Sequence, residues 1–155
     1  METFTGNHVN IHAFWPTKNI EPIITNEIQQ VIIPEIIKIL PKVGCRVLAV
    51  NTMPDHIHLL FWLNPDYSVY TIVETVKKRT AAHINENKMC KKKFIWSEKI
   101  YSYSVANENV PEVSAIIRLQ KGHHANMTFN DEVAKHLQNV ERLLRLSNEK
   151  SFTRW

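Results

Sequence analysis

Two histidines separated by one residue, His56 and His58, are the first candidates for chemistry in this sequence. Their neighbours are rich in Leu, Phe and Trp, which favours a strand, and alternate side chains of a strand point to the same face. Imidazole nitrogens are common ligands of divalent cations, so the pair is suited to holding one ion. The chain has eight histidines, and the alternative is that both members of this pair are structural.

The sequence around these histidines, MPDHIHLL at 53–60, resembles the metal-binding signature of the HUH single-strand DNA transposases. This family comprises the small one-tyrosine transposases of insertion sequences and the repeat-associated tyrosine transposases. Three further matches occur in the family's order and extend the resemblance over nearly the whole chain: GCRVLAV at 44–50; Phe94 and Trp96 followed by YSV at 103–105; and Gln120, His123 and His124 followed by Thr128, Phe129 and Glu132.

The resemblance implies a metal-dependent reaction on DNA. In such enzymes two histidines and a helical glutamine, here His56, His58 and Gln120, hold Mg²⁺ or Mn²⁺ against the scissile phosphate. A tyrosine four residues before that glutamine attacks the phosphorus, since the cation neutralises phosphoryl charge and the phenol needs such activation. The implied partner is hairpin-forming single-stranded DNA. The implied assembly is a homodimer whose active sites combine the histidines of one subunit with the glutamine helix of the other.

The position four residues before Gln120 is Ile116, which has no atom that can attack phosphorus. Three interpretations stay open. The chain is a domesticated, non-catalytic single-stranded DNA-binding relative of the transposases; Tyr101 or Tyr103 replaces the missing nucleophile; or a metal-activated water cleaves the strand. The metal site and a DNA partner persist in all three.

Two cationic segments are candidate DNA contacts. They comprise Lys77, Lys78 and Arg79 on a predicted helix, and Lys91, Lys92 and Lys93 just before Phe94 and Trp96; His124 is a further candidate. Positive charge beside aromatic rings is typical of surfaces that bind single strands. Charge runs are also commonly solvated helix faces, and the two rings are equally compatible with the core. The net charge of +4 permits a nucleic-acid partner without requiring one.

The elements that must position these residues follow from hydrophobic periodicity and from turn and cap signals. We predict strands at 8–14, 45–51, 56–63 and 101–105, and helices at 25–40, from Ser68 onward, at 111–124 and at 130–146. Thr25 and Asn26 are candidate caps of the first helix and Ser68 of the second, and Pro34 should kink or restart its helix. The order is typical of an α+β, ferredoxin-like β-α-β-β-α-β fold with an antiparallel sheet, helices on one face and two additional C-terminal helices.

Composition excludes several other classes. With 155 residues, 44% of them hydrophobic, we expect a single domain spanning 1–155. The three glycines lie too far apart for a dinucleotide fingerprint or a phosphate-binding loop. Cys45 and Cys90 lack the spacing of a zinc finger. The sequence has no signal-peptide pattern and no apolar run long enough to span a membrane, so we expect a cytoplasmic protein.

Overall fold

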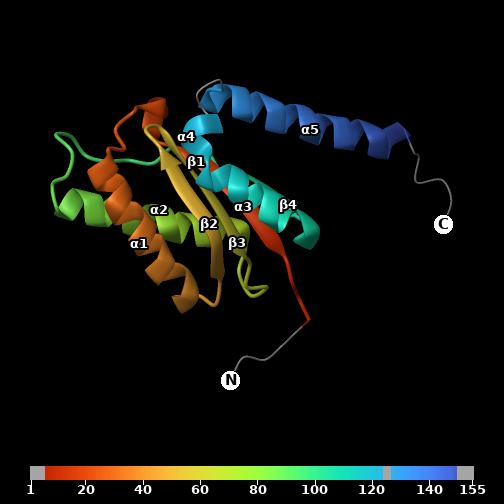
Figure 1. Cartoon of the computed structure of the whole chain (residues 1–155), viewed down its shortest axis with the longest axis horizontal. Coiled ribbons are helices and arrows are strands. Elements are labelled where there is room, and N and C mark those ends of the chain that lie inside the picture. The colour runs from red at the N-terminus through yellow and green to blue at the C-terminus, as the bar shows by residue number, and fades with distance from the viewer. Residues whose placement is uncertain (1–5, 124–126, 150–155) are drawn as a thin grey trace.

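A four-stranded sheet forms the centre of the molecule (Figure 1). The computed structural model describes residues 6–123 and 127–149. The strand order is β2-β3-β1-β4, and all neighbouring strands are antiparallel. The strands are β1 (Asn10–Pro16), β2 (Arg46–Met53), β3 (His56–Trp62) and β4 (Tyr101–Val105). The predicted α+β, ferredoxin-like arrangement is therefore confirmed.

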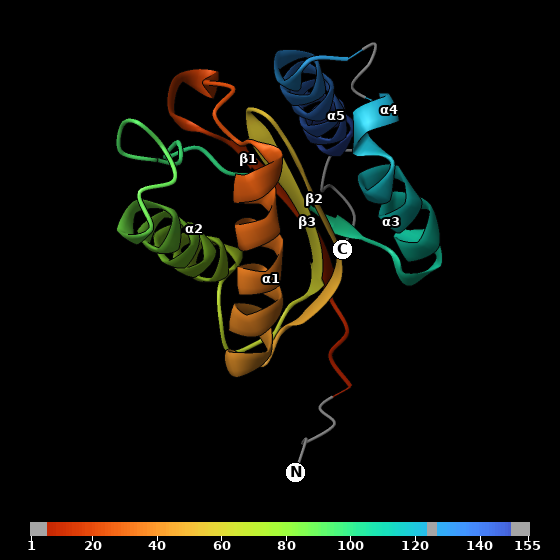
Figure 2. The same cartoon turned by 60° about the vertical axis from the view of Figure 1, so that its left-hand side comes forward.

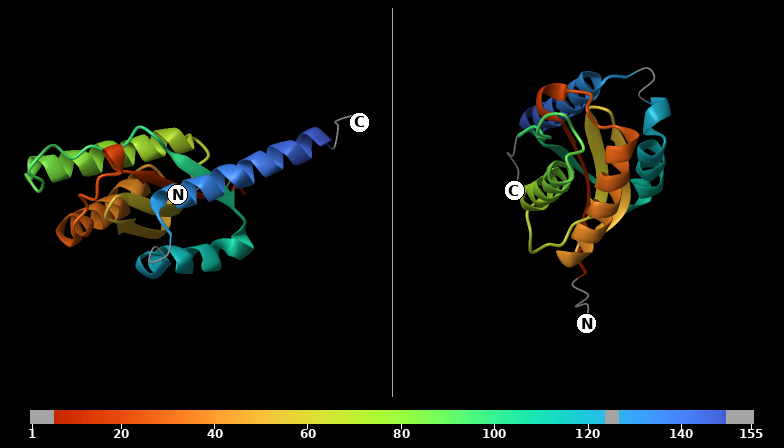
Figure 3. Two further views of the ribbon diagram at one scale, coloured as in Figure 1. Left: turned by 90° about the horizontal axis from the view of Figure 1, so that it is seen from above. Right: turned by 90° about the vertical axis from the view of Figure 1, so that its left-hand side faces the viewer.

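Helices cover both faces of this sheet. The first pair, α1 (Asn26–Lys42) and α2 (Val69–Glu86), packs on one face, and the C-terminal helices lie on the other (Figure 2). The C-terminal helices are α3 (Val110–Arg118), the single turn α4 (Gln120–His123) and α5 (Phe129–Glu149), whose far end extends past the sheet (Figure 3). Short 3₁₀ turns lie within two of the connections: η1 (Lys18–Ile20) between β1 and α1, and η2 (Asn107–Asn109) between β4 and α3. No helix in the described part of the chain has the length and apolarity needed to cross a membrane.

The alternation of β3 assigns its side chains to two different environments. Ile57, Leu59 and Phe61 are fully buried in the main apolar core beneath α1 and α2. His56 and His58 point to the opposite face, because neighbouring residues of a strand alternate sides. This face, covered by the C-terminal helices, is where the site lies.

Of the predicted helix caps, Thr25 and Ser68 are confirmed, while Asn26 is the first residue of α1. Thr25 accepts a hydrogen bond from the Ile28 backbone N–H, and Ser68 accepts one from that of Thr71. The predicted restart of the helix at Pro34 is wrong, since α1 runs without a break from Asn26 to Lys42. Five apolar side chains at helical spacing are buried on its inner face and hold it to the sheet: Ile28, Ile32, Ile36, Ile39 and Leu40.

The predicted single helix over 111–124 is instead divided at Leu119. The Asn51 amide, on β2, donates to the backbone carbonyls of Ile117 at 3.0 Å and Arg118 at 3.3 Å. These carbonyls are satisfied from outside the helix, so α3 ends there and a new turn begins at Gln120. The break places Gln120 at the start of α4 rather than on the same helix as Ile116.

Candidate metal centre

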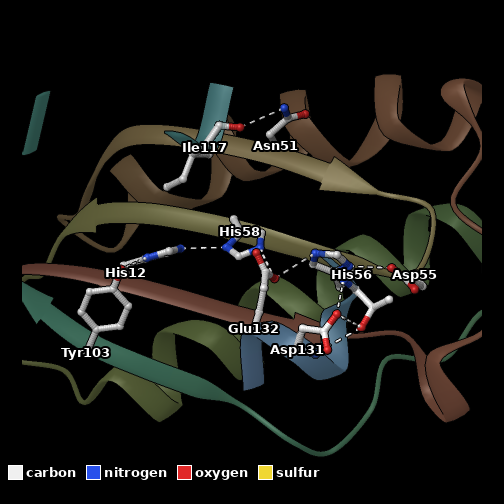
Figure 4. A network of polar contacts seen from close by, with 10 residues as sticks. His12, Asn51, Asp55, His56, His58, Tyr103, Ile117, Asp131 and Glu132 are labelled. Atoms are coloured by element: carbon white, nitrogen blue, oxygen red, sulfur yellow. Dashed lines mark hydrogen bonds and ion pairs between the residues drawn. The ribbon is translucent and has the colours of Figure 1, made fainter. Parts of the chain in front are cut away.

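The two histidines of β3 converge on one carboxylate, that of Glu132 in the first turn of α5 (Figure 4). Glu132 Oε2 lies 3.0 Å from His58 Nε2 and 3.4 Å from His56 Nε2. One potential ligand atom from each of the three residues lies within 4.8 Å of the other two. The structure thus brings the predicted pair together and adds a third donor that sequence reasoning did not name as a ligand.

His56 is oriented by the turn that precedes it. Its Nδ1 lies 2.5 Å from the Asp55 carboxylate, so its Nε2 faces Glu132. Burial disfavours the charged imidazole, but the contacts with Asp55 and Glu132 outweigh burial and raise the pKa of His56 above its ordinary value. A carboxylate behind a histidine is a common arrangement at metal sites, where it fixes the ring and makes the ligand more basic.

His58 is oriented differently, by a third histidine. Its Nδ1 lies 2.8 Å from Nε2 of His12 on β1, and Nδ1 of His12 lies 2.6 Å from the Tyr103 hydroxyl on β4. His12 and Tyr103 are directly opposite in the strand register, and both lie on the His58 face (Figure 4). Burial, reinforced by the neighbouring His58, lowers the pKa of His12 to about 3.

Glu132 is positioned by the cap that begins α5. The Asp131 carboxylate accepts from the Thr128 backbone N–H and hydroxyl, while the Thr128 hydroxyl accepts from the Asp131 N–H, which resembles a capping box. Glu132 follows in the first helical turn. Burial acts to raise its pKa, but hydrogen bonding with His56 and His58 dominates and holds the pKa well below its usual range. The cap signal was readable in the sequence; the approach of α5 to the histidines was not.

Gln120 supplies a fourth candidate ligand. Its side chain is 1% exposed, and its Oε1 has no hydrogen-bond partner among the described residues. It lines a cavity of about 450 Å³ together with His58 and Glu132. Buried polar atoms are normally paired, and an amide oxygen is a suitable ligand for a hard cation. Two imidazoles, a carboxylate and an amide oxygen are therefore a donor set that fits a divalent ion.

The nucleophile candidates fall into two groups in this structure. Ile116 and Tyr103 line the same cavity as Gln120. Tyr101 does not line it, because its ring stacks on Phe14 with centroids 5.4 Å apart. Of the two tyrosines named from the sequence, Tyr103 lines the cavity of the candidate centre and Tyr101 does not.

The cationic residues predicted to contact DNA differ in their exposure. Lys77 is buried and donates to the backbone carbonyls of Ser97 at 2.8 Å and Lys99 at 3.2 Å, so the expectation that it lies on the polar outer face of its helix is wrong. Burial, which Glu74 opposes, lowers the pKa of Lys77. The other five side chains are exposed: Lys78, Arg79, Lys91, Lys92 and Lys93. Of these, Lys92 forms an ion pair with Glu21. His124 lies outside the described residues.

The two aromatic residues beside these lysines belong to the core. Phe94 is 1% exposed and Trp96 is 6% exposed, and the Trp96 indole N–H donates to Thr80 at 2.9 Å. Their rings pack edge to face with centroids 4.9 Å apart. They are not available as stacking surfaces for bases, so the core interpretation of these two residues holds.

The fold and the site together define a ferredoxin-like domain with a histidine-pair centre on one sheet face. A family model for IS200-like transposases matches residues 5–120, and the chain belongs to this family. No curated protein matches the sequence significantly.

Two solved structures share the fold. A proposed transposase from Deinococcus radiodurans R1 is 20% identical, with a TM-score of 0.61 over 77% of this chain and 98% of that one. A REP-associated tyrosine transposase bound to a REP hairpin is 16% identical, with a TM-score of 0.59 over 86% of each chain. At these identities the similarity concerns the fold.

Proposed function

We propose that this chain is a non-cleaving member of the transposase family, which binds hairpin-forming single-stranded DNA through a divalent ion. One observation carries the proposal: the cavity that gathers His58, Gln120 and Glu132 is lined by isoleucine at position 116, where the family resemblance expects the attacking tyrosine. The donors for a metal are present, and the expected nucleophile is absent from the same cavity.

The residues that would hold the ion are His56, His58 and Glu132, with the Gln120 amide oxygen as a fourth donor. A bound Mg²⁺ or Mn²⁺ would neutralise charge on a phosphate of the DNA backbone. The surrounding protein positions the two ligands: Asp55 fixes the His56 ring, and both histidines have almost no exposed surface.

A groove on the other side of the molecule supports DNA as the partner. Lys78 and Lys93 are both exposed and line an open depression of about 1110 Å³ between α2 and residues 93–98. Ammonium groups along a groove attract a phosphate backbone in a salt-dependent way. The relative bound to a REP hairpin indicates the class of DNA to test first.

We also propose that the chain acts as a homodimer with composite sites. The support is the apolar surface of α5, on which Leu137, Leu143 and Leu144 are 52%, 66% and 60% exposed. Contiguous exposed leucines on a helix that extends past its own sheet are typical of an interface with another chain. Sedimentation analysis of the wild type and of Leu143→Glu tests this point, and a wild-type monomer would contradict it.

Cleavage by Tyr103 is the second candidate function. Its hydroxyl lies 2.6 Å from His12, and its side chain lines the cavity of the candidate centre. Burial and the nearby Glu132 carboxylate raise the pKa of Tyr103, so the phenol is protonated at neutral pH and would have to lose its proton during attack.

The deciding experiment is a denaturing gel of the protein incubated with MnCl₂ and labelled single-stranded hairpins from the flanks of its own gene. We expect the wild type to bind in a native gel, to lose binding in EDTA, and to leave the strand whole. Ile116→Tyr is expected to form a covalent protein–DNA adduct, because it returns a phenol to the cavity.

Other outcomes of the same gel would replace this proposal. A wild-type adduct that disappears in Tyr103→Phe would establish the second candidate. Cleaved DNA without an adduct would identify water as the nucleophile. Wild-type protein that binds no hairpin, with or without MnCl₂, would contradict DNA binding at this centre.

A further inference from the structure

The two candidate metal ligands of β3 have different groups behind them. His56 Nδ1 faces a carboxylate, that of Asp55, whereas His58 Nδ1 faces another imidazole, the ring of His12. Nothing in the family resemblance or in the spacing of the sequence gives His12 a role. Its side chain is 6% exposed, and both of its ring nitrogens have a polar neighbour within 2.8 Å.

We infer that His12 is a positioning residue, which holds His58 in the tautomer that presents Nε2 to a metal ion. This inference rests on the proposed metal site. An imidazole that binds an ion through Nε2 carries its hydrogen on Nδ1, so His58 must donate from Nδ1. Nε2 of His12 lies 2.8 Å from that atom, so in this tautomer of His58 the His12 nitrogen accepts the hydrogen bond.

The direction of the next hydrogen bond follows. If Nε2 of His12 accepts, the neutral ring carries its own hydrogen on Nδ1, and that N–H donates to the Tyr103 oxygen at 2.6 Å. The order is then His58 to His12 to Tyr103, across three adjacent strands. Tyr103, which also lines the cavity of the site, is left with its hydroxyl hydrogen directed away from His12.

The strand register makes this arrangement rigid. His12 lies opposite Tyr103 on β4 and opposite Leu60 on β3, one alternate position from His58. Phe14, also on β1, stacks on the His58 ring with centroids 5.3 Å apart and a 14° angle between the planes. The His58 ring is thus held in plane by Phe14 and at its Nδ1 edge by His12. A substitution at 12 leaves the Phe14 stacking partner of His58 in place and removes the contact at the Nδ1 edge.

Mn²⁺ affinity of matched variants tests the inference. We compare the wild type with His12→Leu, which cannot accept a hydrogen bond, and with His12→Gln, whose amide can accept from His58 and donate to Tyr103. Metal-free protein is titrated with MnCl₂, and the free ion is followed by electron paramagnetic resonance. We expect His12→Leu to bind about 10- to 100-fold more weakly, and His12→Gln to recover most of the loss.

Two controls separate the possible failures. If the wild type and His58→Ala bind Mn²⁺ equally or not at all, the proposed metal site itself is wrong. If His58→Ala loses binding while a folded His12→Leu binds as tightly as the wild type, the metal site stands and the role of His12 is overturned. Equal losses in His12→Leu and His12→Gln would likewise contradict a role that depends on accepting a hydrogen bond.

A measurement on the unaltered protein covers the case in which His12→Leu does not fold. Long-range ¹H–¹⁵N spectra of the wild type loaded with ZnCl₂ report which ring nitrogens carry hydrogen. We expect hydrogen on Nδ1 of both His58 and His12 and a bare Nε2 on His12. Hydrogen on Nε2 of His12 would reverse the direction of the contact and refute the inference.

Discussion

The two faces of the sheet differ in chemistry although a single strand, β3, contributes alternate residues to both. Toward α1 and α2 it presents Ile57, Leu59 and Phe61, each with no exposed surface. Toward the C-terminal helices it presents His56 and His58, which are almost as deeply buried. Burial alone therefore does not distinguish the structural face from the functional one.

The two faces differ in the contacts that their buried side chains require. Apolar groups need only close packing, and the α1 and α2 face supplies it. Buried imidazoles cost free energy unless each nitrogen has a partner, and the opposite face supplies those partners from four separate elements. Truncating a side chain on the first face should therefore lower mainly the stability of the fold, and truncating a ligand on the second should lower mainly the affinity for the metal ion.

The largest expected effect is on the apolar face. Leu59→Ala should lower the free energy of unfolding by about 3 kcal/mol, because it removes a fully buried side chain and leaves a cavity. Urea denaturation measures the loss. Mn²⁺ affinity of the folded fraction should stay within about 2-fold of the wild type, and a large drop in affinity would show that the two faces are not independent.

On the opposite face the corresponding change is His58→Ala. We expect Mn²⁺ affinity to fall by at least about 100-fold, or about 2.7 kcal/mol, since a ligand is removed. Circular dichroism at 20 °C should retain the wild-type spectrum. Unchanged Mn²⁺ affinity in this variant would remove the basis for calling the face functional.

Sequence reasoning recovered the parts of this comparison that depend on local pattern. Alternation assigned His56 and His58 to one face, and the caps at Thr25 and Ser68 followed from residue type and spacing. The order of elements then sufficed for the fold, because a β-α-β-β-α-β chain has few ways to bury its apolar faces.

What sequence reasoning missed depends on contacts between distant segments. Glu132 is 74 residues from His58 and reaches it because α5 returns across the sheet. The helix break before Gln120 depends on Asn51, whose side-chain amide donates hydrogen bonds to two backbone carbonyls at the end of α3. Lys77 has the spacing of a surface residue, but the carbonyls of residues 97 and 99 bind its ammonium.

The pH dependence of stability gives a smaller effect on the functional face. His12 has a folded pKa of about 3 and an unfolded pKa near 6.5, so below pH 6.5 only the unfolded chain binds this proton. Its contribution to stability is present above pH 6.5 and is lost as the pH falls. Between pH 6.5 and 5 the loss is about 2 kcal/mol at 1.36 kcal/mol per unit.

Comparison with His12→Gln isolates this contribution. His56 has a raised folded pKa, so its contribution is complete below pH 6.5 and declines only as the pH rises through that pKa. The titration of His56 therefore does not mask the loss of stability caused by His12 between pH 6.5 and pH 5. The free energy of unfolding is measured with urea in EDTA at pH 6.5 and at pH 5. From the higher to the lower pH it should fall by about 2 kcal/mol more in the wild type than in His12→Gln. Identical responses would mean that His12 is charged in the folded protein.

The smallest effect distinguishes two neighbouring lysines of α2. Both lysines line the groove, but Lys78 is exposed, whereas Lys77 is buried and its ammonium is bound to backbone carbonyls. If the groove contacts phosphates, Lys78→Gln should reduce the slope of log affinity against log salt for a hairpin by about 1, with stability unchanged within about 0.5 kcal/mol. Lys77→Gln should leave the slope unaltered and lower stability by about 1 kcal/mol, because two carbonyls lose their donor. Equal slopes in all three proteins would place the DNA elsewhere, whereas a reduced slope in Lys77→Gln would show that its ammonium leaves the carbonyls when DNA binds.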